Sequence, residues 1–175
     1  MKTYAIRQLN LMDRRSFTDA LGEIFEHSPW IAERAWNSRP FAGKEQLHAV
    51  MLTIVDEACE EEKLGLIRAH PDLGARLRMS ELSVNEQKGA GLSELTADEF
   101  AEFSACNQAY TQRFGFPFII AVKGKSKEAI LEAMKHRLTL DREEEKRQAL
   151  NQIAAITRFR LNDLIPLEEE SNDGA

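Results

Sequence analysis

The residues best suited to chemistry lie between Arg68 and Gln87. His70 stands directly before Pro71, and a proline disfavours the helical conformation for the residue that precedes it. We therefore predict that His70 ends a helix in an extended or turn conformation, with its ring off the helix surface. A histidine placed in this way can give or take a proton near neutral pH. The alternative is a helix-ending histidine that only hydrogen-bonds to the backbone.

A second polar group follows in the run Ser83-Val84-Asn85-Glu86-Gln87. Ser83 and Glu86 have the spacing of a capping box, which alone would explain both side chains and contributes roughly 1 kcal/mol. A helix N-terminus also presents free backbone N–H groups and the positive end of the helix dipole. The run could therefore form a polar cradle for a ligand, with Glu86 bringing a carboxylate to the acid–base chemistry of His70.

Arg160 is the third candidate because it interrupts an apolar stripe on a helix. Ile153, Ile156, Arg160 and Leu164 are spaced by three or four residues, so they share one face. An unpaired guanidinium on such a face would be costly, which predicts an oxygen partner. That partner could be a carboxylate of the protein or a group of a ligand, and the sequence leaves both open.

Metal and nucleophile chemistry have less support. Asp72 lies close to His70, which leaves a metal-dependent hydrolase as a rival interpretation. However, no histidine pair has the close spacing of a zinc site, so no metal is expected. Cys59 and Cys106 are interpreted as small core residues rather than nucleophiles.

The elements that must position these residues are almost all helical. The apolar spacing and the capping residues predict an all-α, single compact domain of about eight helices over residues 1–166, followed by an acidic tail over 167–175. The helices are expected after Asp13 with Phe17, Leu21, Ile24 and Phe25 on one face, from Ser28 and Pro29, over 47–58, over 64–70, from Ser83, from Thr96 to a stop at Gly115, from Ser126 to Leu138, and from Asp141 to about Leu164.

Residues 116–122 form the one strand-like run, bounded by Gly115 and Gly124. One run cannot build a sheet, so we predict an extended, buried segment packed on helices. It could be plain core. Alternatively, backbone N–H and C=O groups that no sheet uses could bind the polar edge of a heterocycle while the side chains exclude water.

Length and charge narrow the class of protein. The chain has 175 residues, which suits one domain, and its net charge of −6 argues against a nucleic-acid partner. No apolar run approaches the length of a membrane span. Two cysteines without a CxxC pattern favour a reducing compartment, and the N-terminus does not look like a signal peptide. We therefore expect a cytoplasmic protein.

Four ordered motifs carry a resemblance to a known family. They are His70-Pro71-Asp72-Leu73-Gly74, then Ser83-x-x-Glu86-Gln87 with Ala90-Gly91-Leu92, then Phe114-Gly115-Phe116-Pro117-Phe118-Ile119-Ile120, then Ile153-x-x-Ile156-x-x-Phe159-Arg160-Leu161-x-Asp163-Leu164. Together they resemble the 2-oxo-4-hydroxy-4-carboxy-5-ureidoimidazoline (OHCU) decarboxylases of urate breakdown. The resemblance extends from about Phe17 to Leu164.

The resemblance implies an all-α homodimer that converts its small-molecule substrate, OHCU, to (S)-allantoin and carbon dioxide without cofactor or metal. By motif position, His70 matches the catalytic histidine, Glu86 the active-site glutamate and Arg160 the substrate-binding arginine. The implied substrate-lining residues are Pro71, Ser83, Val84, Asn85, Glu86, Gln87, Phe118, Ile119, Ile120, Ala121 and Val122. The rival from another class is a helical module that binds a purine-like ligand or a partner protein without turnover.

Overall fold

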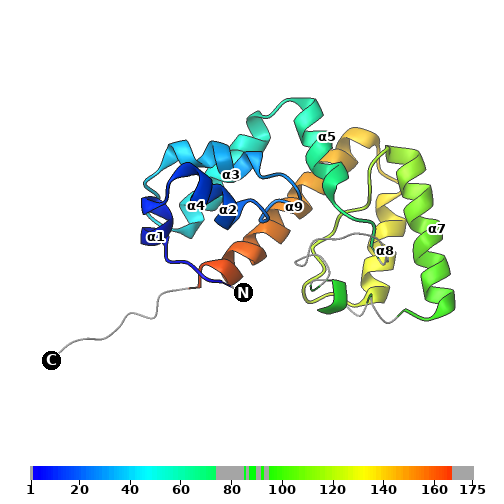
Figure 1. Cartoon of the computed structure of the whole chain (residues 1–175). Coiled ribbons are helices and arrows are strands. Elements are labelled where there is room, and N and C mark those ends of the chain that lie inside the picture. Colours follow the sequence, from blue (N-terminus) through cyan, green and yellow to red (C-terminus); the bar gives the residue numbers. More distant parts are fainter. Residues whose placement is uncertain (1, 74–84, 86, 90–91, 93–94, 167–175) are drawn as a thin grey trace. The chain divides into compact units, whose positions relative to one another are not determined.

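Helices make up nearly all of the regular structure (Figure 1). The computed structural model describes residues 2–73, 85, 87–89, 92 and 95–166, and in these there is no strand. The prediction of an all-α fold is thereby confirmed. The described helices are α1 (Ile6–Leu11), α2 (Arg14–Leu21), α3 (Trp30–Ala35), the 3₁₀ helix η1 (Trp36–Ser38), α4 (Lys44–Glu57), α5 (Glu60–Ala69), α7 (Ala97–Phe114), α8 (Lys127–Arg137) and α9 (Arg142–Leu164).

The contacts within the chain group it into two compact units. The first takes the residues up to Ala58 together with those from Thr157 onwards, and the second is Cys59–Ile156. Helix α9 contributes to both. The division into one domain over 1–166 and an acidic tail stays a prediction, and the tail lies outside the described residues.

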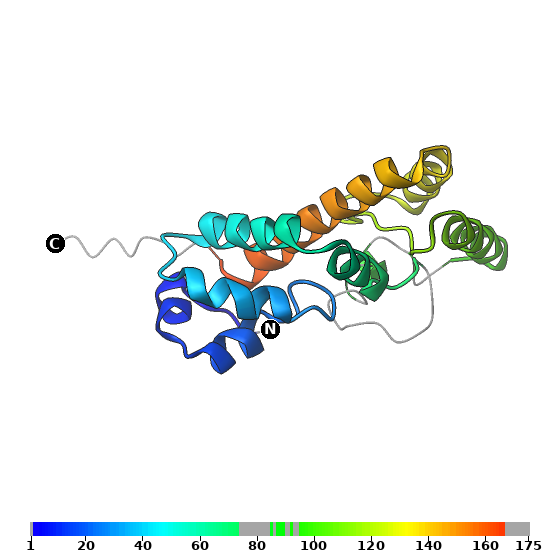
Figure 2. The same ribbon diagram turned by 90° about the horizontal axis from the view of Figure 1, so that it is seen from above.

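The first unit packs α1 to α4 with the C-terminal part of α9. Its buried side chains include Leu9, Phe17, Ile31, Leu47 and Met51. The α4 helix is tied to α9 by a hydrogen bond of 3.0 Å between His48 Nε2 and Thr157 Oγ1. Figure 2 shows α4 running beside the red end of α9.

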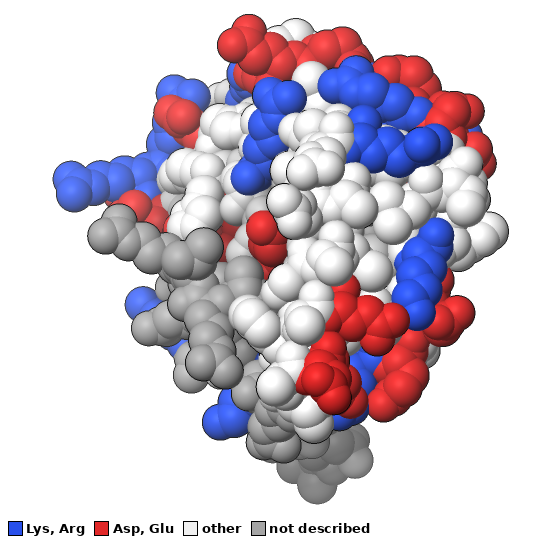
Figure 3. All heavy atoms as spheres, turned by 90° about the vertical axis from the view of Figure 1, so that its right-hand side faces the viewer, with Lys and Arg blue, Asp and Glu red and all other residues white. Residues whose placement is uncertain are grey.

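The second unit packs α5, α7, α8 and the N-terminal part of α9. Helices α7 and α8 lie side by side (Figure 1), and Lys127–Glu99 and Lys135–Glu102 ion pairs of 2.5 and 2.9 Å join them. On the face seen in Figure 3, acidic and basic side chains are interspersed rather than gathered by sign. That pattern differs from the basic stripe that binding to a phosphate backbone requires.

Local capping signals predicted several helix ends correctly. The Thr96 hydroxyl accepts from the Glu99 N–H, and the Glu99 carboxylate accepts from the Thr96 N–H. Ser126 and Asp141 cap α8 and α9 by accepting N–H groups three residues on. Gly115 ends α7 with a left-handed φ of 79°, which costs a glycine little.

Two boundaries near the N-terminus differ from the prediction. Helix α2 ends at Leu21, before a glycine of low helix propensity, and Ile24 and Phe25 are buried from the turn that follows rather than from the helix. Ser28 is not the cap of α3; its hydroxyl donates to the Glu26 carbonyl at 3.0 Å instead. In the part of the chain that the structure describes, no helix is long and apolar enough to cross a membrane.

Candidate functional site

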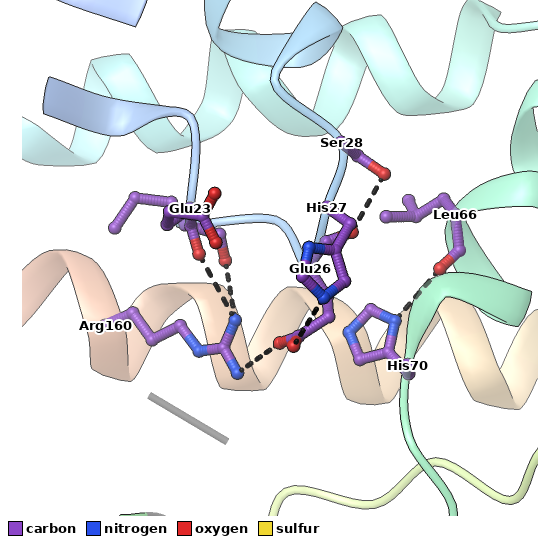
Figure 4. A network of polar contacts seen from close by, with 8 residues as sticks. Glu23, Glu26, His27, Ser28, Leu66, His70 and Arg160 are labelled. Carbon is purple, nitrogen blue, oxygen red and sulfur yellow. Dashed lines mark hydrogen bonds and ion pairs between the residues drawn. The ribbon is translucent and has the colours of Figure 1, made fainter. Parts of the chain in front are cut away.

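His70 has the backbone conformation that the following proline predicted. It follows α5 with φ −76° and ψ 140°, and its side chain is buried. Its Nδ1 lies 2.9 Å from the Leu66 carbonyl oxygen, a pair labelled in Figure 4. A carbonyl only accepts, so Nδ1 must carry the proton and donate it. In the neutral ring, Nε2 is then the basic nitrogen that can take a proton from a substrate.

Two hydrogen bonds hold the segment around His70 against α7. Before it, Arg68 Nε donates to the Gly115 carbonyl at 3.1 Å. After it, Asn107 Nδ2 donates to the Leu73 carbonyl at 2.8 Å. The Asp72 carboxyl lies between these anchors, and partial burial raises its pKa. The histidine therefore sits on a backbone that is fixed on both sides.

Part of the predicted polar cradle can be placed. Asn85 is helical and exposed, and Gln87 is helical and buried. Ser83, Val84 and Glu86 lie outside the described residues. Both interpretations of Glu86, as a cap and as an acid–base partner, therefore stay predictions.

The extended segment is buried throughout the stretch that the resemblance implies as substrate-lining. Each residue from Phe118 to Val122 is less than a tenth exposed, and Pro71, on the His70 side, is half-buried. Side chains of other elements hold its backbone: Arg137 Nη1 donates to the Ile119 carbonyl at 2.6 Å, and Gln152 accepts from the Ala121 N–H at 2.9 Å. The prediction of an extended, buried segment packed on helices is confirmed.

Arg160 has an internal partner. Its Nη2 donates to Glu26 Oε2 at 3.0 Å, and its Nη1 lies 3.2 and 3.4 Å from the carbonyl oxygens of Ile24 and Glu23 (Figure 4). Both side chains of the ion pair are almost fully buried. Of the two partners left open for Arg160, the internal carboxylate is therefore present. Its role towards a substrate stays a prediction.

The turn that carries Glu26 is conformationally unusual. His27 has a φ of +46°, a left-handed value that few residues other than glycine adopt. Its Nε2 lies 3.8 Å from Glu26 Oε1, and Ser28 fixes the Glu26 carbonyl (Figure 4). Strain of this kind persists where the surroundings over-determine the backbone, and here they hold the partner of Arg160.

The predicted site residues are divided between the two units. His70, Gln87 and Phe118–Val122 belong to Cys59–Ile156, and Arg160 belongs to the unit that contains Glu26. Among the described residues, no three His, Cys, Asp or Glu side chains gather as ligands of a metal ion.

Sequence reasoning missed a buried network in the second unit. Arg137 and Glu145 form an ion pair in which Arg137 Nε donates to Glu145 Oε2 at 3.0 Å and Nη2 donates to Oε1. The Tyr110 hydroxyl donates to the same carboxylate. Arg137 lies on the stripe Ile130, Met134, Arg137, so the reasoning that identified Arg160 would have found it.

The comparisons with known proteins agree with the motifs. The sequence profile described as OHCU decarboxylase matches residues 10–162. The chain is 49% identical over 168 residues to the uric acid degradation bifunctional protein PucL of Bacillus subtilis (strain 168), covering 96% of this chain and 34% of that protein. It is 44% identical over 161 residues to the 2-oxo-4-hydroxy-4-carboxy-5-ureidoimidazoline decarboxylase of Haloferax volcanii, covering 92% of this chain and 96% of that protein.

Solved structures agree as well. The crystal structure of (S)-allantoin synthase superimposes with a TM-score of 0.77 at 31% identity, over 93% of this chain and 54% of that chain. A crystal structure of OHCU decarboxylase in the presence of (S)-allantoin gives a TM-score of 0.68 at 23% identity, over 87% and 98%, a likeness of fold. The chain spans about a third of the Bacillus protein's length and nearly all of the Haloferax protein's. It belongs to the OHCU decarboxylase family.

Proposed function

We propose that this chain decarboxylates OHCU to (S)-allantoin in urate breakdown. Family membership supports the reaction, and one geometric observation carries its chemistry: the Leu66 carbonyl holds Nδ1 of the His70 ring, so that Nε2 is the basic nitrogen. The Haloferax relative has this activity in its name, and the Bacillus relative is named for uric acid degradation.

The substrate can act as its own electron sink. Its carboxylate sits on a ring carbon that also bears a hydroxyl and adjoins a C=N bond. When the bond to the carboxylate carbon breaks, its electron pair forms a C=C bond, and the C=N electrons move to nitrogen, which takes a proton. The hydroxyl then loses its proton to become a carbonyl, while the neighbouring carbon gains one. The protein has only to orient the ring, place charge and move protons.

His70 is proposed as the general acid–base group for the hydroxyl or ring proton, a role that typically contributes about 10²- to 10⁴-fold to the rate. Glu86 would position His70 or the ureido and ring N–H groups. Arg160, already paired with Glu26, would orient a carbonyl or developing enolate oxygen. A tight grip on the departing carboxylate would stabilise the ground state and slow the reaction.

The remaining predicted residues would line the substrate. Phe118–Val122 would exclude water and present one face of the ring to the proton, which gives one enantiomer of the product. Pro71 and the run Ser83–Gln87 would contact the polar edge. The burial of Phe118–Val122 and of Gln87 supports this assignment.

The family resemblance also supports a homodimer, and the two cysteines without a CxxC pattern support a location in the cytoplasm. Light scattering on the purified chain would test the assembly, with twice the mass of 19.9 kDa expected. A monomer at micromolar concentration would contradict the homodimer and leave the proposed reaction unaffected.

Circular dichroism tests the reaction itself. Urate is oxidised by urate oxidase and hydroxyisourate hydrolase, with and without this chain, and the optical activity of the product is followed. The substrate is expected to decay by itself to racemic allantoin. Rapid appearance of one enantiomer supports the decarboxylase. Unchanged decay to the racemate, with a folded protein present, would discard it in favour of a binding module.

A further inference from the structure

All three guanidinium nitrogens of the buried Arg137 donate hydrogen bonds. Its Nε and Nη2 both donate to the Glu145 carboxylate, and Nη1 donates to the Ile119 carbonyl at 2.6 Å. The Tyr110 hydroxyl donates to Glu145 as well. Glu145 and Tyr110 are fully buried and Arg137 is 7% exposed. Side chains of three helices, α7, α8 and α9, thus meet in one polar cluster. Nη1 of Arg137 connects this cluster to the extended segment.

The same cluster also holds the ring of Phe118. The guanidinium carbon of Arg137 lies 4.5 Å from the ring centroid of Phe118, within the range of cation–π attraction. The Tyr110 ring meets Phe118 edge-on, with centroids 5.3 Å apart. One residue further along the segment, the Ile119 carbonyl is fixed by Arg137. Side chain and backbone are therefore held by the same group.

A second hydrogen bond holds the segment two residues after Ile119, where the Gln152 side chain accepts from the Ala121 N–H at 2.9 Å. The Ile119 carbonyl and the Ala121 N–H are thus both bound by side chains of α8 and α9. The two hydrogen bonds fix the backbone of the segment at two points.

Stability alone is a weak reason for such a cluster. Taking two charges out of water costs several kcal/mol for each ion, and well-packed apolar residues often serve the fold as well or better. A lysine could pair with Glu145 or reach Ile119, but it lacks the rigid fork that does both. The geometry that arginine supplies is what the arrangement uses.

We propose that Arg137, held by Glu145 and Tyr110, is a positioning residue that fixes the Phe118 ring and the Ile119 carbonyl, and through them the face on which the substrate is protonated. The inference rests on the proposed function. It predicts that loosening the network lowers the enantiomeric purity of the allantoin, because a mobile segment no longer shields one face of the ring. A residue that served only the fold would not affect that purity in the surviving folded molecules.

The experiment compares Arg137→Lys and Tyr110→Phe with wild type by circular dichroism of the product, kcat, KM and melting temperature, with each variant added at a concentration at which catalysed turnover far exceeds the spontaneous decay. Arg137→Lys should lower kcat about tenfold or more and give a clear loss of (S) excess, since displacements of about 1 Å can cost 10²-fold. Tyr110→Phe should also lower kcat and the (S) excess, but by less, because Arg137 keeps its hydrogen bond to the Ile119 carbonyl. Tyr110→Phe also serves if Arg137→Lys does not fold.

Two control variants on α8 separate position from charge and stability. Lys135→Gln removes a positive charge from the exposed side of the helix and should leave rate and (S) excess unchanged. Ile130→Val lowers the melting temperature from a fully buried position outside the network, and its product should stay enantiomerically pure.

Three results would overturn the inference. Wild-type kcat and (S) excess in Tyr110→Phe and in folded Arg137→Lys would leave Arg137 no positioning role. A loss of (S) excess in Ile130→Val as large as that in the network variants would make it an effect of stability. Racemic product from wild type itself would defeat the proposed function, and the inference with it; a wild type that gives one enantiomer confines any failure to the inference.

Discussion

Two buried arginines, one in each unit, are paired with buried carboxylates in different ways. Arg137 forms a forked pair with Glu145, which also accepts from Tyr110. Arg160 makes one described hydrogen bond to the Glu26 carboxylate and directs Nη1 at two backbone carbonyls. The first arrangement gives its carboxylate three donors from packed helices, while the second holds its carboxylate on a turn.

This difference suggests different tasks. The Arg137 pair fixes a backbone segment, and helices supply every side chain in it. The Arg160 pair depends on a turn with a left-handed residue, His27, at its centre. Both pairs are buried, so neither can move without repacking the core, but the Arg160 pair depends on the backbone of one turn and the Arg137 pair on the packing of three helices.

The largest expected effect comes from breaking the Arg160 pair. Arg160→Met leaves Glu26 buried without its charge partner, which should cost about 3–5 kcal/mol of unfolding free energy. We also expect turnover to fall to background. Denaturant unfolding and the circular dichroism assay measure the two effects.

The double variant Arg160→Met with Glu26→Gln separates these effects. Removing the buried charge should recover much of the lost stability, while turnover stays absent if Arg160 acts on the substrate. Turnover that returned together with stability would reduce Arg160 to an internal ion pair.

Tyr110→Phe removes one donor from the Glu145 carboxylate in the Arg137 pair. Loss of a hydrogen bond to a charged group should cost about 1.5–3 kcal/mol. Burial and the Glu145 carboxylate raise the pKa of Tyr110. The unfolded chain ionises near its ordinary pKa of about 10 and the folded chain does not, so this tyrosine stabilises the wild type below that pH and the benefit is lost above it.

Chemical unfolding between pH 7 and pH 11 tests this prediction. The stability difference between wild type and Tyr110→Phe should narrow as the pH rises through 10. A difference that stayed constant up to pH 11 would contradict the raised pKa.

Local patterns in the sequence predicted the helices from α2 onwards and the position of His70, but not α1 (Ile6–Leu11). The proline after His70 acts on the adjacent backbone, and the caps at Thr96 and Ser126 act within three residues. Residues close in sequence are therefore enough to predict these features. The end of α2 was missed because Ile24 continues the apolar spacing although the chain has already turned. Apolar residues that are buried in a turn can have the same spacing along the sequence as apolar residues on one face of a helix.

The partners of the charged residues could not be predicted in the same way. Arg160 stood out on an apolar stripe, but Glu26 lies 134 positions away, and only the packed chain shows that they meet. The spacing of Arg137 and Glu145 along the chain is short, yet a loop between two helices sets their distance. A charged residue on an otherwise apolar helix face predicts that the charge has a partner. Which residue that partner is depends on the tertiary structure.

A smaller effect should follow from relieving the turn at His27. His27→Gly removes the side chain from a left-handed backbone, and the gain should stay below about 1 kcal/mol because glycine also gains entropy in the unfolded chain. Gly115→Ala, at φ 79°, is the opposite change and should destabilise by a similar amount. Thermal unfolding measures both, and a destabilised His27→Gly would show that its contact with Glu26 outweighs the strain.

The smallest expected effect concerns Asp72, where burial rather than a cation sets the pKa. A raised pKa means that the folded chain binds the proton more tightly, so this group disfavours folding once the pH exceeds the folded pKa. Asp72→Asn should therefore raise the melting temperature slightly at pH 7 and leave it unchanged near pH 3, where both states of the wild type are about fully protonated. A gain that was equal at both pH values would contradict this cause.

His70→Asn in the circular dichroism assay is the most direct test of whether His70 transfers the proton. We expect a folded protein, with the melting temperature close to wild type, that leaves the substrate to decay to racemic allantoin. A variant that still produced one enantiomer at most of the wild-type rate would contradict it and remove His70 from the chemistry.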